Sequence, residues 1–305
     1  MQIFHALSDI DKAAQGCVVV IGNFDGVHRG HQAVLRKAKD VATQKGVKLA
    51  VLTFEPHPAS LFRPDEPPFR LTPFDLKAER LEIAGVDVLF ACGFNWDFAS
   101  QSHERFIQEI LKDSLQPVNI IVGKDFRFGQ LRKGSPADIA AAGLSVEVLD
   151  EVQDAHGEKF SSSRIREFLR QGNLAAAHDI LGWEWEIRGV VEQGDQRGRE
   201  LGYPTANMAL GDTLHPAYGV YAVRVQIEGE EQWRAGATNI GIRPMFEVRV
   251  GQVETYLFDF DREIYGKILR VRPVYRLRGE AKFNTMEELI AQIDKDCAQA
   301  REILK

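Results

Sequence analysis

The sequence predicts two domains of different fold class, a parallel α/β domain over residues 1–182 and an antiparallel β-barrel with a C-terminal helix over residues 183–305. The length of 305 residues suits two domains of roughly 150 residues each. Strand-like and helix-like segments alternate in the first part, which is typical of a parallel sheet. After Gly182 and Trp183 the segments become rich in β-branched residues and are separated by Gly, Pro and Asp, which favours a small barrel.

The strands expected in the first domain are short apolar runs, which are typical of strands buried on both faces. They cover residues 17–21, 48–54, 86–92, 119–122 and 145–149. Helical spacing of apolar residues is found at 31–44, 73–84, 104–115, 136–142, 162–170 and 174–181. This order predicts a sheet that helices cover on both faces.

The strands expected in the second domain cover residues 186–191, 220–227, 235–240, 248–260 and 268–277. Residues 194–207 are rich in glycine and charge and are interpreted as one long loop, and long loops on small domains are usually functional. A final helix is expected from Met286 to Leu304, because Thr285 and Glu288 form the pattern of a capping box.

Composition and charge exclude several classes of protein. The formal net charge is −6, and residues 186–305 contain 17 Lys and Arg against 19 Asp and Glu, so no nucleic-acid partner is expected. The chain contains no run of roughly 18–20 apolar residues and no visible signal peptide, so no membrane partner is expected either. Three widely spaced cysteines favour a reducing compartment. We therefore expect a cytoplasmic protein that is a monomer or a weak homo-oligomer.

A glycine-rich segment, residues 22–31, joins the first expected strand to the first expected helix. Ligands of parallel sheets bind beyond the carboxyl ends of the strands. The glycines of this segment let backbone approach a phosphate, and the helix N-terminus offers N–H groups and positive potential. His28 and His31 can donate hydrogen bonds to phosphate oxygens, which favours a reaction that builds charge on a triphosphate and releases pyrophosphate.

Two other interpretations of this segment stay open on the residues alone. One is a glycine-rich turn with two surface histidines. The other is a zinc site, although no third ligand follows at a convincing spacing. The spacing His-x-Gly-His directly after a strand is more specific than a glycine-rich loop and favours the phosphate site.

Residues 22–31 resemble the signature of the HxGH nucleotidyltransferases, specifically the adenylyltransferase module of bacterial bifunctional riboflavin kinases/FAD synthetases. Residues 53–58, 123–129 and 161–166 match further motifs of this module in the expected order. Ser163 stands where the family usually has Thr, which retains a hydroxyl. The resemblance implies a Rossmann-like sheet, ATP as co-substrate and FMN as the group that receives AMP.

The resemblance also implies individual site residues. His28 and His31 would act in adenylyl transfer. ATP or phosphate contacts are implied for Gly22, Phe24, Asp25, Gly26, Gly30, Asp125, Ser162, Ser163 and Arg166. Flavin contacts are implied for Phe54, His57, Pro58, Phe62, Phe126 and Phe128. On the residues alone, N-capping by the serines, an ordinary loop carboxylate at Asp125 and a core position for most of the aromatic rings stay open.

The end of the loop at 194–207 carries two hard oxygen ligands, the Thr205 hydroxyl and the Asn207 amide oxygen, of the kind that Mg²⁺ binds together with waters and phosphates. A turn in which both groups satisfy nearby backbone is the alternative. Residues 202–207 resemble the magnesium–nucleotide motif of riboflavin kinases, which implies an ATP contact for Gly202, and residues 239–244 and 265–266 also match that domain.

Glu254 is the expected general base of the kinase. It shares strand parity with Tyr256 and Phe258, and a carboxylate on an aromatic face is either costly or useful. The resemblance implies that Glu254 accepts the proton of the riboflavin 5′-hydroxyl as this hydroxyl attacks the γ-phosphate of ATP. The chain departs from the family at Met245, where Thr is usual, and at Tyr256, where His is common.

Four arginines of the last expected strand, at positions 270, 272, 276 and 278, share one parity. We expect Arg270, Arg272 and Arg276 on a solvated face. The resemblance implies a flavin or nucleotide contact for Arg278.

The function implied is a two-step flavin cofactor synthase with riboflavin, FMN and ATP as its partners and Mg²⁺ as its metal. The barrel would phosphorylate riboflavin to FMN, and the α/β domain would join FMN to AMP, giving FAD and pyrophosphate. Two rivals stay open. An adenylyltransferase whose barrel binds RNA is disfavoured by the acidic barrel, and a non-catalytic flavin-binding protein is disfavoured by the two phosphate motifs.

Overall fold

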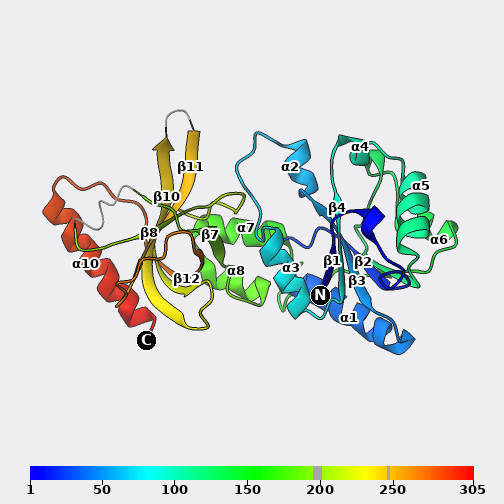
Figure 1. Cartoon of the computed structure of the whole chain (residues 1–305), viewed down its shortest axis with the longest axis horizontal. Helices are drawn as coiled ribbons and strands as arrows, with labels where there is room; N and C mark the ends of the chain where they lie inside the picture. Colours follow the sequence, from blue (N-terminus) through cyan, green and yellow to red (C-terminus); the bar gives the residue numbers. More distant parts are fainter. Residues whose placement is uncertain (195–200, 246–247) are drawn as a thin grey trace. The chain divides into compact units, whose positions relative to one another are not determined.

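A computed structural model describes residues 1–194, 201–245 and 248–305, with side chains described except at 243–245 and 248–250. The chain divides into two compact units, Met1–Glu66 with Thr72–Ser161 and Pro67–Leu71 with Ser162–Lys305. Each unit contains one six-stranded sheet (Figure 1). No helix of the described ranges is long and apolar enough to cross a membrane.

The first unit is built on a parallel sheet with the strand order β1-β4-β3-β2-β5-β6, which confirms the predicted α/β class. The strands are β1 (Gln2–Phe4), β2 (Val18–Ile21), β3 (Leu49–Glu55), β4 (Val88–Gly93), β5 (Asn119–Gly123) and β6 (Val146–Leu149). The edge strand β1 was not predicted, because three residues carry too little pattern to stand out.

Helices cover both faces of this sheet (Figure 1). They are α1 (Arg29–Lys45), α2 (Pro58–Phe62), α3 (Phe74–Ile83), α4 (Trp96–Ala99), α5 (His103–Arg105), the π-helical η2 (Phe106–Leu115) and α6 (Pro136–Ala141), with short 3-10 turns η1 (Leu7–Asp9) and η3 (Gln130–Arg132). Val18 and Val20 of β2 pack in a cluster with α1 and α3, whereas Val19 and Ile21 pack in a cluster with η2 and α6. Burial of alternate side chains on opposite faces explains why the strands read as unbroken apolar runs.

The second unit begins with α7 (Ser162–Gln171) and α8 (Leu174–Leu181) and continues into an antiparallel sheet. Its order is β7-β12-β9-β10-β11-β8. The strands are β7 (Ile187–Val190), β8 (Ala206–Ala209), β9 (Gly219–Ile227), β10 (Trp233–Met245), β11 (Val248–Leu257) and β12 (Ile268–Arg278). The Glu192 N–H donates to the Asn207 carbonyl (2.8 Å), so the two edge strands nearly close a barrel, as predicted.

The C-terminal helix α10 (Met286–Ile303) confirms the predicted final element and packs against β9, β10 and β12 (Figure 1). The Thr285 hydroxyl accepts the Glu288 N–H (3.2 Å), which caps the helix. The Glu288 carboxylate accepts the N–H of Asn284 (3.0 Å). Ala300 and Leu304 bury against Ala222, Ala237 and Phe258, so the helix covers one part of the outer barrel surface.

The interpretation of 194–207 as one loop is wrong at its C-terminal end. Ala206–Ala209 form strand β8, which pairs antiparallel with β11. Pro204, Asn207 and the two alanines are weak strand formers, and only the distant partner strand makes this segment extended. Residues 195–200 of the predicted loop lie outside the described residues.

The expected solvated face of Arg270, Arg272 and Arg276 is also wrong. Arg270 and Arg272 bind the Glu186 carboxylate (2.9 Å each), together with Arg188 (2.6 Å), and the Glu186 side chain is fully buried. The Arg276 guanidinium donates to the Tyr218 carbonyl (2.6 Å). Register shifts between Pro273 and Tyr275 and between Arg276 and Arg278 break the single parity that the sequence suggested.

Glu186 anchors this arginine cluster as an anion. Burial by itself raises the pKa of the Glu186 carboxyl, but the hydrogen bond from Arg270 and the charges of Arg188 and Arg270 outweigh it and hold the pKa below its usual 4.5. Arg272 also lies over the Trp233 ring, 3.8 Å from its centroid. The carboxylate therefore ties β7 and β12 to each other and to β10.

We expect Glu186→Gln to lower the free energy of unfolding by about 3 kcal/mol, because removal of one partner leaves the guanidinium groups half-buried without their counter-charge. Urea unfolding followed by circular dichroism measures this loss. Glu184→Gln is the matched control, because Glu184 is 44% exposed and lies 3.6 Å from Arg272, and it should change stability by about 0.5 kcal/mol or less. Equal effects of the two variants would contradict the anchoring role.

Candidate active sites

The loop between β2 and α1 in the first unit is strained and tightly held. Phe24 (φ 51°) and Val27 (φ 38°) both adopt left-handed backbone, which is uncommon for non-glycine residues and a clear outlier for a β-branched one. Each such residue costs about 1–3 kcal/mol and persists only when surrounding structure imposes it. The loop residues predicted to bind ATP therefore have a conformation that the rest of the unit must stabilise.

Asp25 and Thr72 provide this stabilisation. The Asp25 carboxylate, which is 2% exposed, accepts the Thr72 N–H (3.0 Å) and the Thr72 hydroxyl (3.2 Å). The same hydroxyl accepts the N–H of Gly26 (2.9 Å). Asp25 thus fixes the loop to the segment that precedes α3. Thr72 was not predicted, because nothing in its local sequence marks a partner so distant in the chain.

His28 and His31 lie together at the start of α1. The His28 Nδ1 caps the helix by accepting the His31 N–H (3.3 Å), and the two rings stack with centroids 3.7 Å apart. Gly30 makes this close packing possible, because a Cβ there would lie 3.1 Å from both the His28 ring and the Phe160 side chain. The predicted signature is therefore one compact unit of two rings at a helix N-terminus.

His31 is neutral near pH 7. Burial, followed by the charges of His28 and Lys77, lowers the pKa of His31 well below its usual 6.5. Its buried Nδ1 has no hydrogen-bond partner within the described residues. Lys77 is itself fully buried and donates to the Glu55 carboxylate at the end of β3 (2.6 Å). His31 can therefore donate a hydrogen bond to a phosphate without carrying charge.

The other residues predicted to contact ATP lie on separate elements. Asp125 follows β5 and accepts a hydrogen bond from Lys159 (2.6 Å), which lowers the pKa of Asp125. Ser162 and Ser163 occupy the first turn of α7, which belongs to the second unit. On the same helix, Arg166 donates to the Phe69 carbonyl (2.9 Å) and lies over the Phe69 ring. The role of these residues in adenylyl transfer stays a prediction.

Four of the residues predicted to contact flavin lie between the end of β3 and α2, and the other two, Phe126 and Phe128, follow β5. His57 caps α2 by accepting the Ala59 N–H (3.1 Å), and Pro58 is the first residue of that helix. Phe54 and Phe128 belong to the core cluster, with Phe126 packed partly buried against it, whereas Phe62 is 54% exposed. The core position that the residues left open is thus found for Phe54 and Phe128.

In the second unit, strand pairing brings one residue from each of five strands to the same level. Glu254 of β11 pairs with Asn207 of β8 on one side and with Asn239 of β10 on the other. Asn239 pairs in turn with Val220 of β9, and Val220 pairs with Arg278 of β12. We call these residues the cross-strand row. Directly paired residues point to the same face of a sheet, so the row forms one continuous surface.

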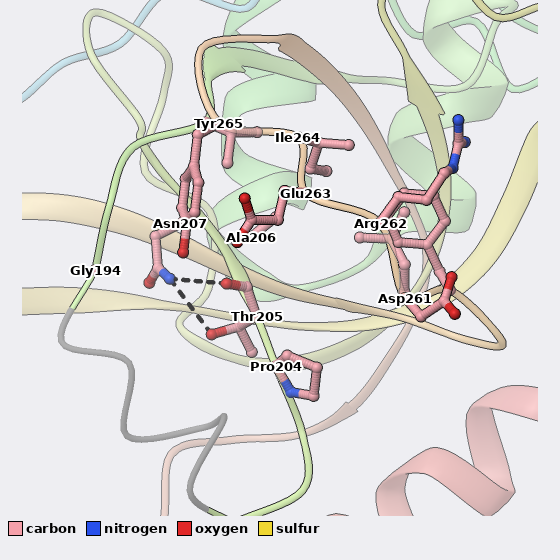
Figure 2. A pocket seen from close by; sticks show the side chains of 13 residues that line it. Gly194, Pro204, Thr205, Ala206, Asn207, Asp261, Arg262, Glu263, Ile264 and Tyr265 are labelled. Atoms are coloured by element: carbon pink, nitrogen blue, oxygen red, sulfur yellow. Dashed lines mark hydrogen bonds between the residues drawn. The ribbon is translucent and has the colours of Figure 1, made fainter.

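Two neighbouring cavities border these strands, and this surface lines the larger one. The larger cavity, about 470 Å³, contains the whole cross-strand row and is bounded by Leu289, Ile293, Asp296 and Cys297 of α10. The smaller cavity, about 270 Å³, lies between β8, the end of β7 and residues 260–265. Thr205 and Asn207 line both cavities. Figure 2 shows them at one end of the smaller cavity, with Asp261 and Arg262 at the other.

The Asn207 side chain is held in place at this shared wall. Its amide N–H group donates to the Thr205 carbonyl (3.1 Å) and the Thr205 hydroxyl (3.4 Å) (Figure 2). Gly194 packs against the amide so closely that a Cβ would lie 2.6 Å from Nδ2. The alternative in which Thr205 and Asn207 bind nearby backbone is therefore partly found, but the amide N–H makes these bonds and the amide oxygen does not. The amide oxygen of Asn207 is therefore not used by these bonds, and oxygens of this kind are the ligands that Mg²⁺ prefers.

No three His, Cys, Asp or Glu side chains of the described residues are grouped so that they could hold a metal ion. Gly202 lies in the turn between Leu201 and Tyr203, and both neighbours line the larger cavity. Tyr256 lines it as well and meets the Tyr203 ring edge to face (5.4 Å). The Met245 side chain lies outside the described residues.

Arg278 lines the larger cavity while bound to α10. Its guanidinium pairs with the Asp296 carboxylate (2.8 Å), and Asp296 is 4% exposed. Gln292 also donates to Asp296 (2.9 Å), and the guanidinium lies over the Phe283 ring. Arg278 therefore holds the helix against the barrel at the cavity, a contact that sequence parity did not reveal.

Comparison with known proteins assigns both units to described families. The model of the FAD synthetase family matches residues 10–164, and the model of the riboflavin kinase family matches residues 181–304. A crystal structure of a Streptococcus pneumoniae protein described as a macrolide-efflux protein superposes with a TM-score of 0.83 at 31% identity, covering 96% of each chain.

Two curated relatives cover nearly the full length. The bifunctional riboflavin kinase/FMN adenylyltransferase of Bacillus subtilis is 42% identical over 98% of this chain and 96% of its own length. The Haemophilus influenzae protein of the same name is 36% identical over 99% of this chain and 98% of its own length. The chain therefore belongs to the family of bifunctional riboflavin kinases/FMN adenylyltransferases.

Proposed function

We propose that residues 1–182 carry the adenylyl transfer and residues 183–305 the phosphorylation, each with the site residues described above. The chain is a transferase that uses ATP to convert riboflavin to FMN and FMN to FAD. The separate family matches at 10–164 and 181–304 support this division. We further propose that both reactions take place in the cytoplasm, in a monomer or weak homo-oligomer.

The cross-strand row is the observation that carries the kinase proposal. It places one carboxylate, Glu254, between the two amides Asn207 and Asn239, on a surface that opens into the larger cavity. We assign riboflavin to this cavity and ATP to the smaller one. Glu254 accepts the proton of the riboflavin 5′-hydroxyl, the hydroxyl oxygen attacks the γ-phosphorus, and ADP leaves.

Thr205 and Asn207 are the proposed Mg²⁺ ligands, since they lie in the wall that both cavities share. Bound Mg²⁺ would supply charge neutralisation at the β- and γ-phosphates. The protein contributes the position of the two oxygens, which the Asn207 amide bonds and the packing of Gly194 hold in place. Catalysis then rests mainly on positioning.

In the first unit, His28, His31 and the N-terminus of α1 are assigned to the triphosphate of a second ATP. The FMN phosphate attacks the α-phosphorus, and pyrophosphate leaves. Negative charge builds on the leaving group, where hydrogen bonds from two imidazoles and from helix N–H groups stabilise it. No residue of the described loop needs to form a covalent intermediate.

Glu254→Gln is expected to lower FMN formation by about 10²–10⁴-fold, because the amide cannot accept the proton. FMN adenylylation by the same protein should be unchanged. Chromatography of flavins after incubation with riboflavin or FMN, ATP and magnesium measures both. Glu231→Gln changes an exposed glutamate of the same unit and should leave both rates alone. Retained kinase activity in Glu254→Gln would rule out its role as base.

His28→Asn combined with His31→Gln should abolish FAD formation while FMN formation persists. Asn at position 28 keeps an N-cap for α1, so the variant removes the imidazoles without removing the cap. Circular dichroism checks the fold, and the same chromatography measures the products. Parallel loss of both activities in a folded variant would count against separate sites.

The low pKa of His31 predicts a pH-dependent stability. The neutral, buried His31 ring contributes fully to the free energy of unfolding above pH 6.5. As pH falls, the unfolded chain binds a proton at His31 before the folded protein does, so this contribution is lost as pH falls through the folded pKa. Over this range the free energy of unfolding falls by at most about 1.4 kcal/mol per pH unit. In ¹H NMR, the His31 ring signal, assigned with His31→Gln, should still have its neutral shift at pH 6.5 in folded protein and should titrate at lower pH there than in denatured protein. Half-titration at pH 6.5 in the folded state would contradict this.

A further inference from the structure

Aromatic rings of the first unit form a chain of contacts that ends at the surface. Phe54, at the end of β3, contacts Phe94 with ring centroids 5.8 Å apart. Phe94 contacts Phe62 (5.9 Å), and Phe62 contacts Trp96 (5.6 Å). The chain therefore leads from the core to α2, which carries Phe62, and to the first residue of α4, which is Trp96.

Exposure changes sharply along this chain of rings. Phe54 is 9% exposed, whereas Phe62 is 54% and Trp96 is 61% exposed. Two large apolar rings from different helices thus leave more than half of their surface in water at one place. The free energy of the unit would fall if a ligand covered them, because burial of apolar surface stabilises by about 25 cal/mol per Å².

The two exposed rings form a corner. Their planes meet at 80°, so a flat molecule that stacks on the indole of Trp96 meets the Phe62 ring at its border. Backbone around Trp96 is fixed, because the Asn95 side chain accepts the Phe98 N–H (2.8 Å) and the Ser100 hydroxyl donates to the Trp96 carbonyl (2.6 Å). The backbone that carries Trp96 is therefore ordered before any ligand binds, which lowers the entropy cost of binding.

We propose that Trp96 stacks on the isoalloxazine ring of FMN during adenylyl transfer and that Phe62 contacts the dimethylbenzene edge of the same ring. This inference rests on the proposed function, in which the first unit uses FMN as acceptor. The corner is made of hydrocarbon and indole rings. A dimethylbenzene edge fits it, whereas the edges of adenine carry nitrogen atoms that need hydrogen-bond partners.

Steady-state kinetics of FMN adenylylation tests the proposal. Trp96→Ala should raise KM for FMN about tenfold, as expected for loss of one stacked ring, and leave KM for ATP unchanged. Trp96→Phe keeps a ring and should stay within about threefold of the parent. Ile83→Ala, which truncates a side chain that is 67% exposed at the end of α3, is the control and should change neither constant.

Fluorescence gives a second readout. Trp96 is the tryptophan of residues 1–182, and Trp183, Trp185 and Trp233 follow later in the sequence. The emission of wild-type protein minus that of Trp96→Phe therefore reports this indole. Titration with FMN should quench this difference signal, because stacking on a flavin provides a nonradiative path.

Three results would overturn the inference. The first is an unchanged KM for FMN in Trp96→Ala, and the second is a rise in KM for ATP instead of KM for FMN, which would make adenine the stacked ring. The third is a difference signal that FMN does not quench. The double histidine variant separates this failure from failure of the proposed function. If that variant still makes FAD, the assignment of adenylyl transfer to the first unit is wrong. If it loses FAD synthesis while Trp96→Ala binds FMN normally, only the role of Trp96 is wrong.

Discussion

Strand register decides which side chains meet in both units of this chain. In the parallel sheet, the pairs Ile21–Leu52, Glu55–Gly93 and Gly123–Leu149 bring the carboxyl ends of the strands to one edge, where the candidate adenylyl residues follow. In the barrel, antiparallel pairing sets Glu254 between Asn207 and Asn239. A slip by one residue would move Glu254 to the opposite face of β11, where Val253 and Thr255 are fully buried. Backbone hydrogen bonds therefore position the chemistry before any side chain does.

Polar side chains then hold the irregular segments that register leaves undetermined. The Asp25–Thr72 contact fixes the strained β2–α1 loop, and the Arg278–Asp296 pair fixes α10 beside the larger cavity. Both contacts join segments far apart in the sequence and both are largely buried. Electrostatic interactions of this kind are strong because little water screens them. The overall acidity of the chain does not oppose its anionic substrates, because the groups assigned to phosphate are local to the two sites.

Most of the fold could be predicted because hydrophobic patterns differ between the units. Strands β2 to β5 read as apolar runs since both of their faces are buried, and α1 and α10 show helical spacing of their apolar residues. The short strands β1 and β8 were not predicted, since their extended form depends on partner strands elsewhere in the chain. The prediction that the four arginines of β12 share one face was wrong, because the register shifts in this strand depend on tertiary structure. Sequence motifs identified Glu254, Thr205 and Asn207 as site residues. Their positions on one surface, and the partners Thr72 and Asp296, became visible only in the three-dimensional structure.

The shared wall between the two cavities has a thermodynamic consequence. Thr205 and Asn207 border both volumes, and their amide–hydroxyl contact allows one arrangement to serve both. A ligand in either cavity that shifts this pair changes the binding free energy of the ligand in the other. Linkage requires the effect to be reciprocal, so each ligand changes the affinity of its neighbour by the same factor. A site built this way couples the occupancy of one cavity to that of the other.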